Sequence, residues 1–257
     1  MPRIIALDVE TTGLEPTDKI VEIGLIDIEE SGVGPSNGFY LGDAASSLID
    51  PKIPIPIPAM AVHHITDEMV MGVPDDPATT LMDMIFMDTV SMENKGDFPD
   101  FIVAHNAKFD RQFIDPLIDE YSQRDNFQWI CTYKVAAHLY RDAPSHKNAA
   151  VFYYLELHRG IYSHLVKGVN LHRAAPDAAI TAAIFCEMTR KLTLDEMVEI
   201  SSKPTLQSKI GFGKHRGKSW DDIDMGYINW ILSKSEDFDE DVVYTARCQK
   251  IERSTRG

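Results

Sequence analysis

Two long apolar runs at the start of the chain limit the folds open to it more than any other feature. The runs "RIIALDVE" and "KIVEIGLIDIE" have the length and the β-branched residues of buried strands. The segment "TTGLEPTD" between them contains the Gly and the Pro of a turn. Together they predict a hairpin-like pair of strands.

The rest of the chain adds a further strand and several helices. The run "FIVA" at 101–104 predicts a buried strand, and helices are expected from about residue 108, over 130–142, over 148–158 and after Pro176. Residues 31–58 are rich in Gly, Pro and Ser and end in "PKIPIPIP", a Pro run that predicts extended chain, and short helical turns around a loop are expected over 59–70. Strands joined to crossover helices indicate an α/β layered domain.

The first run contains two acids, Asp8 and Glu10. Side chains alternate between the faces of a strand, so both carboxylates point the same way. Two like charges in a partly dry place raise at least one pKa unless a positive charge lies between them. A divalent cation with oxygen ligands, Mg²⁺ or Mn²⁺, would meet that need. The alternative is a strand end that emerges into solvent, and this pair alone does not decide between them.

Length and composition exclude several classes of protein. A chain of 257 residues with 44% hydrophobic content suits one sizeable domain, alone or with a small appendage. No apolar window of about 18 residues predicts a membrane span, and the start has no signal-peptide layout. Three widely spaced cysteines fit neither a disulfide framework nor a zinc site. We therefore expect a cytoplasmic protein with no membrane partner, and leave its oligomeric state open.

The charge distribution changes after about residue 200. The net charge of -15 argues against holding long nucleic acid by bulk electrostatics, so any such contact must be local. Residues 203–220, "KPTLQSKIGFGKHRGKSW", nevertheless contain five Lys or Arg and no acid. We expect a main domain over 1–200 and a small module over 205–257 whose basic loop could bind DNA. Its aromatics could stack bases or form its core, and we favour the core for Trp230 and leave Trp220 open.

Three motifs follow one another along the chain: "LDVETTGL", "VAHNAKFD" and "HRAAPDAA". Each acid in them has an ordinary explanation alone, since Asp110 and Asp177 could each favour a helix N-terminus. As a set, the motifs resemble those of the DEDD-type 3′–5′ exonucleases, in the DnaQ-like (DEDDh) branch with H-x-x-x-x-D, over about residues 1–195. The segments "AMAVHHIT" and "WICTYKVA" and the tail are most similar to bacterial exonuclease X enzymes. Extra material lies around 31–45 and 85–98, and a phage-encoded homologue is also possible.

The resemblance implies a fold, a reaction and a set of site residues. The fold would be ribonuclease-H-like α/β, a mixed five-stranded sheet flanked by helices. The reaction would be 3′–5′ hydrolysis at DNA 3′ ends, single-stranded or frayed, that releases nucleoside 5′-monophosphates with two divalent cations, Mg²⁺ or Mn²⁺. His172 would be the general base, and the catalytic metal ligands would be Asp8, Glu10, Asp110 and Asp177.

The resemblance also suggests residues that bind substrate, and it leaves other functions open. The expected contacts to the terminal nucleotide come from Thr11, Gly13, Leu14, His64, Ile65 and Asn106. Each of these could instead have only a loop or capping role. The alternatives are a 3′–5′ exoribonuclease or oligoribonuclease with the same chemistry, which contacts to a 2′-OH would distinguish, a non-catalytic nucleic-acid-binding domain, and a carboxylate-metal endonuclease or recombinase.

Overall fold

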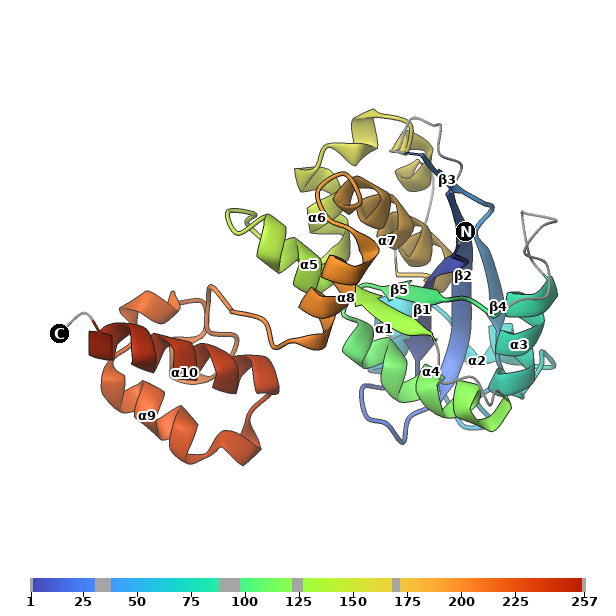
Figure 1. Cartoon of the computed structure of the whole chain (residues 1–257). Helices are drawn as coiled ribbons and strands as arrows, with labels where there is room; N and C mark the ends of the chain where they lie inside the picture. Colours follow the sequence, from blue (N-terminus) through green and yellow to red (C-terminus); the bar gives the residue numbers. More distant parts are fainter. Residues whose placement is uncertain (1, 31–37, 88–97, 122–126, 168–171, 256–257) are drawn as a thin grey trace.

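The computed structural model describes residues 2–30, 38–87, 98–121, 127–167 and 172–255 (Figure 1). A mixed sheet forms its centre, with the strand order β3-β2-β1-β5-β6. Strand β1 (Ile4–Thr11) pairs antiparallel with β2 (Ile20–Glu30) and parallel with β5 (Phe101–Ala104). The predicted hairpin and the predicted strand at 101–104 are confirmed.

The described residues form six strands, where the resemblance implied five. The long strand β2 is paired over one part by β3 (Phe39–Leu41) and over another by β4 (Ala45–Leu48), so two short strands share one edge position. Both lie in the Gly-, Pro- and Ser-rich stretch, ahead of the "PKIPIPIP" run, where we predicted no strand. Most of the extra material expected around 31–45 and 85–98 lies outside the described residues.

The fifth position of the sheet was also missed in the sequence. Strand β6 (Gln128–Cys131) pairs parallel with β5, and helix α5 (Thr132–Leu139) follows it directly. The prediction of a helix over 130–142 was therefore wrong at its start. A four-residue apolar run has no periodicity that separates a buried strand from a buried helix.

Alternate residues of β1 face two different helical layers. Ile4 and Ala6 pack in one cluster with α7 (Ala174–Met188), while Ile5 and Leu7 pack in another. The second cluster includes residues of α3 (Pro77–Met87) and α4 (Ala107–Tyr121). By the same alternation, the side chains at positions 8 and 10 lie on the face that α7 covers.

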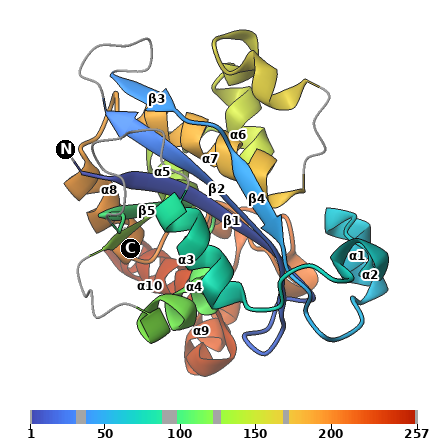
Figure 2. The same cartoon turned by 90° about the vertical axis from the view of Figure 1, so that its right-hand side faces the viewer.

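Further short elements complete the main body. Helices α6 (Asn148–Tyr154) and α8 (Leu194–Ser202) join the α7 side, with the 3₁₀ turns Leu157–Arg159 and Ser163–Val166 after α6. Figure 2 shows α1 (Ile57–His63) and α2 (Asp67–Val70) beyond the end of the sheet at which β1 ends. These are the short helical turns expected over 59–70. None of the helices in the described ranges combines the length and apolarity needed to cross a membrane.

The last part of the chain has an apolar cluster of its own. Helices α9 (Met225–Ser233) and α10 (Glu240–Thr255) and the 3₁₀ turns Gly213–His215, Trp220–Asp222 and Ser235–Asp237 surround it, apart from the sheet in Figure 1. Trp220 is 1% exposed in this cluster, whereas Trp230 is 42% exposed. The expectation that Trp230 belongs to the core was wrong, because Trp220 and the aliphatic residues Ile228 and Ile231 already fill it.

Helix α7 approaches β2 closely enough to require a glycine. A Cβ built at Gly24 would lie 2.2 Å from the carbonyl carbon of Ala174 and 2.3 Å from the amide nitrogen of Ala175. Both neighbours are backbone atoms at the start of α7, which cannot turn aside as a flexible side chain can. Gly24 therefore fixes how near the first turn of α7 comes to the sheet.

We expect Gly24→Ala to destabilise the protein by about 3 kcal/mol, the upper end of typical overpacking costs, because backbone must move. Thermal unfolding would measure the change. Gly211→Ala is the matched control, since a Cβ there meets nothing within 4 Å. Equal melting temperatures for the two variants would contradict this explanation of Gly24.

Candidate active site

Three carboxylates from two distant parts of the chain meet at the end of β1. Asp8 and Glu10 come from β1, and Asp177 comes from the first turn of α7. One carboxylate oxygen from each lies within 4.8 Å of the other two. The prediction that Asp8 and Glu10 share a face is confirmed, and that face is the one on which Asp177 arrives.

Asp110 lies beside this group but is not one of the three. It occupies the first turn of α4 and is 2% exposed. Its carboxylate accepts a hydrogen bond from the backbone N–H of Val9. The paired positions of β1 and β5 end at Ala6, and α4 begins soon after β5, so Asp110 lies near the end of β1. Asp110 is close enough to Asp8 for its charge to raise the pKa of that carboxyl.

When no cation is bound, the carboxyls of this cluster have raised pKa values and favour the protonated form. Burial, followed by the charges of Asp177 and Glu22, raises the pKa of Glu10 to about 8. Burial and then the charge of Asp110 raise the pKa of Asp8 well above its usual value. Burial also raises the pKa of Asp177, although the charge of His172 and its backbone N–H act in the opposite direction.

The donor set fits a hard divalent cation. All three converging groups offer carboxylate oxygens, which are the ligands that Mg²⁺ and Mn²⁺ prefer. A bound cation would stabilise the charged carboxylates that burial and mutual repulsion now disfavour. The acidic cluster could therefore hold a metal ion.

A buried ion pair next to the cluster was missed in the sequence. Glu22 of β2 is 1% exposed and accepts hydrogen bonds from Arg173 Nε at 2.8 Å and Nη2 at 2.6 Å. It also accepts the backbone N–H of Ala174 at 3.0 Å and the hydroxyl of Ser46 at 2.9 Å. Burial alone would raise the pKa of Glu22, but these hydrogen bonds lower it overall. A third acid inside an apolar strand, in "KIVEIG", was the signal that could have revealed it.

His172 lies just before α7, next to Arg173 of the ion pair and bonded through its backbone to Asp177 of the acidic cluster. It is exposed and has a left-handed backbone with φ of 64°. The next residue, Arg173, is held by Glu22, and the backbone N–H of His172 donates to the carboxylate of Asp177. The turn that carries His172 is thus tied to both β2 and the acidic cluster. A left-handed non-glycine residue held in this way is the kind of local strain that collects at functional sites.

The last residue of β1 and the loop after it include three of the residues predicted to bind substrate. The hydroxyl of Thr11 donates to the carbonyl of Gly13 at 2.5 Å. The carbonyl of Leu14 accepts the amide of Gln112 at 3.2 Å, while the Leu14 side chain is 77% exposed. The loop is therefore fixed by its backbone and presents an apolar side chain to solvent.

The other three predicted contacts differ in their exposure. His64 and Asn106 are exposed, and both have left-handed backbones, with φ of 60° and 66°. Ile65 is fully buried in a small cluster with Val21, Ile55 and Val70. The structure therefore does not bring Ile65 to the surface, and its side chain would reach a base only if that cluster opened. The substrate-binding roles stay predictions.

Comparisons with known proteins agree with this geometry. The model of the RNase_T family, described as "Exonuclease", matches residues 5–185. Exodeoxyribonuclease 10 of Escherichia coli K12 is 31% identical over 252 residues, which cover 96% of this chain and 97% of that protein. The PolC-type DNA polymerase III of Clostridium perfringens is 30% identical over 208 residues, which cover 80% of this chain and 12% of that protein.

Solved structures give the same result for the fold. A structure of exonuclease X in complex with 5′ overhanging duplex DNA matches with a TM-score of 0.57 and 28% identity, covering 77% of this chain and 99% of that one. A full-length 3′-exonuclease matches with a TM-score of 0.54 at 14% identity, covering 77% of this chain and 62% of that one, a likeness of fold alone. The ribonuclease-H-like α/β fold is thereby confirmed. The chain belongs to the RNase_T exonuclease family and is an enzyme of its DnaQ-like DEDD type.

Proposed function

We propose that the chain is a metal-dependent 3′–5′ exodeoxyribonuclease that releases nucleoside 5′-monophosphates from DNA 3′ ends. The observation that carries this proposal is the meeting of Asp8, Glu10 and Asp177 beside buried Asp110, with His172 at the edge of the group. DNA is favoured as the substrate because the relative that covers nearly the whole chain is named a deoxyribonuclease. The structural match to an exonuclease bound to duplex DNA supports the same substrate.

The proposed reaction assigns a task to each residue of the site. Asp8, Glu10, Asp177 and Asp110 would hold two divalent cations, Mg²⁺ or Mn²⁺. When bound, the cations supply Lewis-acid stabilisation of the charge that develops on the phosphate and on the leaving 3′-oxygen. His172 accepts a proton from the attacking water as the water oxygen bonds to phosphorus, and the P–O3′ bond breaks with its electron pair left on the 3′-oxygen. Glu22 and Arg173 touch no reacting atom in this scheme and keep the turn at His172 in place.

The proposal also divides the chain into two parts. Residues 1–200 form the exonuclease domain, and residues 205–257 form a small module. The separate apolar cluster around Trp220 supports this division, since all its members come from residues 210–246. The module is small for a stable core, and it packs only seven buried residues in that cluster.

The first experiment is an incubation of purified protein with 5′-labelled single-stranded DNA and with RNA of the same sequence. We expect a ladder that shortens from the 3′ end in Mg²⁺ or Mn²⁺, stops in EDTA and is absent from Asp177→Ala. Asp83→Ala, at an exposed acid on α3, is the matched control and should cleave normally. Faster cleavage of RNA would replace the DNA assignment by the exoribonuclease alternative. No cleavage of either strand would overturn the proposal.

The raised pKa values predict how the metal-free protein responds to pH. A carboxyl whose pKa is raised on folding contributes stability that is complete below its unfolded value and is lost as the pH rises through its folded value. For Glu10 that window runs from 4.5 to about 8. Burial holds the pKa of His105 down at about 4, so this group acts in the opposite direction below pH 6.5.

Between pH 7 and 8, loss of protons from the raised carboxyls should therefore determine how stability changes, because His105 no longer contributes in this range. We expect the melting temperature in EDTA to fall by about 3–5 °C per pH unit for each proton held. Mn²⁺ should raise the melting temperature, and more at pH 8 than at pH 7, because it binds the deprotonated carboxylates. Glu10→Gln should flatten both trends, whereas Glu15→Gln, at an exposed acid, should keep them. A Mn²⁺ shift that Glu10→Gln leaves unchanged would argue against Glu10 as a ligand.

The general-base role of His172 makes a separate prediction. We expect His172→Ala to lower kcat by about 10²-fold or more, while Mn²⁺ binding measured by calorimetry persists. His164→Ala, at another exposed histidine, is the matched control and should have normal kcat. An unchanged kcat with weaker DNA binding would show that His172 contacts substrate without moving a proton.

A further inference from the structure

We propose that an aromatic face on the C-terminal part of the chain binds the single-stranded DNA that lies 5′ of the nucleotide being removed. The aromatic face consists of Phe212, Tyr227, Trp230 and Phe238. The inference rests on the proposed exonuclease function and adds a binding site for the strand that leads into it. Its evidence is the stacking of these rings, the charges around them and their position next to α4.

The rings of the aromatic face are arranged as stacking surfaces. Tyr227 and Trp230 lie one turn apart on α9, with ring centroids 5.1 Å apart and planes at 28°. The ring of Phe212 lies 6.5 Å from that of Tyr227, with the two planes at 25°. Phe238 meets the edge of Trp230 at 5.5 Å and lies 4.9 Å from Phe212. The result is one continuous group of rings instead of scattered aromatic side chains.

The rings of the aromatic face are more exposed than residues that only fill the core. Ile228 and Ile231 of α9 are fully buried in the core with Trp220, and Tyr227 and Trp230 occupy the neighbouring positions on the helix. Trp230 keeps 42% of its surface exposed and Tyr227 is half-buried. An exposed indole backed by a second ring offers a rigid flat surface. Every DNA base can stack on such a surface whatever its sequence.

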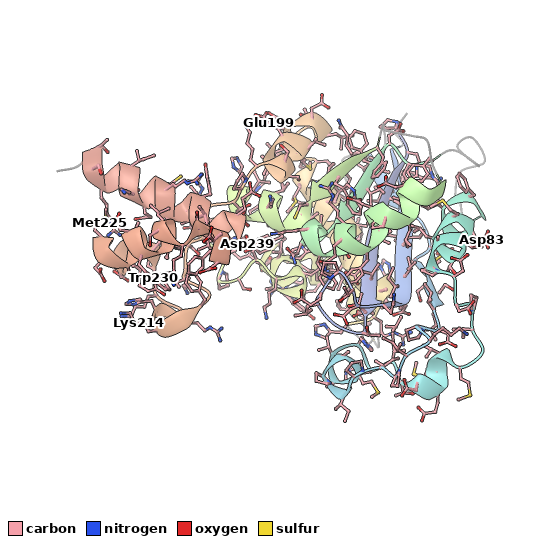
Figure 3. All side chains as sticks on the ribbon, turned by 90° about the horizontal axis from the view of Figure 1, so that it is seen from below. Asp83, Glu199, Lys214, Met225, Trp230 and Asp239 are labelled. Carbon is pink, nitrogen blue, oxygen red and sulfur yellow. The ribbon has the colours of Figure 1, made fainter. Side chains whose placement is uncertain are left out.

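The C-terminal part of this acidic protein is close to neutral, and a lysine lies beside the aromatic face. Residues 203–257 contain ten Lys and Arg against nine acids, while the whole chain contains 25 against 40. The amino group of Lys214 lies 5.6 Å from the centre of the Tyr227 ring. Figure 3 shows Lys214 and Trp230 in the same lobe. A cation beside stacked rings matches a ligand that carries phosphates next to flat bases.

Several nearby acids already have partners within the protein. Asp224 accepts the backbone N–H of Tyr227 as the N-cap of α9, and Asp239 pairs with Lys108. Glu236 and Asp237 remain exposed next to Phe238. Because carboxylates repel phosphates, bases should lie at the Phe238 end of the aromatic face and phosphates at the Lys214 end.

The aromatic face adjoins the helix that carries Asp110. Asp239 follows Phe238 directly, and its carboxylate lies 2.5 Å from the amino group of Lys108 in the first turn of α4. Figure 3 places Asp239 on the side of the lobe that faces the main body. The backbone N–H of Thr205 also donates to Asp241 at 2.7 Å at the start of α10. A strand whose 3′ end lies among the carboxylates can thus continue past α4 onto the rings.

The test measures binding and catalysis separately in the full-length protein. Binding of a fluorescent oligothymidylate is followed by anisotropy in EDTA at low salt, where no cleavage occurs. We expect Trp230→Ala and Tyr227→Ala to weaken binding about tenfold or more each, as the loss of base stacking predicts. Tyr244→Ala removes an aromatic that is 37% exposed on α10, outside the aromatic face, and should bind normally. Trp230→Phe keeps a stacking ring and should retain most of the affinity.

Intrinsic fluorescence gives a direct signal from the site. Trp129 and Trp220 are 9% and 1% exposed, so Trp230 is the tryptophan that a bound base can reach. The oligonucleotide should quench the emission of the wild-type protein, and Trp230→Phe should lose most of that quenching without losing affinity. Quenching that persists in Trp230→Phe would overturn the inference.

A small substrate separates this inference from the proposed function. The p-nitrophenyl ester of thymidine 5′-monophosphate fills the catalytic centre but cannot reach the aromatic face. We expect Trp230→Ala to hydrolyse it with normal kcat/KM while KM for long single strands rises about tenfold. Unchanged KM for long strands, or unchanged oligothymidylate affinity, would overturn the inference and leave the exonuclease assignment intact. Failure of the wild-type protein to cleave any substrate with metal would instead count against the proposed function.

Discussion

The contact between β2 and the start of α7 is the interaction on which the candidate active site depends. Asp8 and Glu10 are more than 160 positions from Asp177 in the sequence, and only the packing of α7 against the sheet brings the three together. Gly24 permits the backbones to touch, and Glu22 binds the side chain of Arg173 and the amide of Ala174. A partly buried pair of this kind adds little net stability, because desolvation of Glu22 offsets the attraction to Arg173. Its value is that it specifies one position for the turn at His172.

The acids are placed where a fold alone would not place them. Burial and mutual repulsion raise the pKa values of Asp8, Glu10 and Asp177, so the protein without a cation either holds protons there or loses stability. The same face of the sheet is otherwise lined by Ile4, Ala6 and their apolar neighbours. Such a departure from the local pattern is expected at functional sites, where neighbouring structure maintains an unfavourable arrangement. In this chain the supporting structure is the β2–α7 contact.

The sequence predicted the parts of the molecule that local pattern determines. Because side chains alternate between the two faces of a strand, the sequence was enough to put Asp8 and Glu10 on one face. The order of the three motifs identified the family. Local pattern failed where long-range pairing decides: β3 and β4 form only because β2 is long enough to pair with both, and β6 is a short apolar run beside a helix. Glu22 was overlooked because its partner Arg173 lies 151 positions away.

The two tryptophans of the C-terminal part also show that local sequence does not decide which residue is buried. Trp220 follows the polar run "KHRGKS" and Trp230 lies in the apolar run "YINWIL", yet the packing of this part buries Trp220 and exposes Trp230. Under our proposal, that outcome explains how an acidic chain can hold a polyanion. With 40 acids against 25 bases, the protein cannot attract DNA by its overall charge. Cations at the carboxylate cluster would neutralise the phosphate at the reacting end, and base stacking with a few local lysines would hold the strand behind it. Stacking depends on no net charge, so an exposed Trp230 serves an acidic exonuclease better than a buried one would.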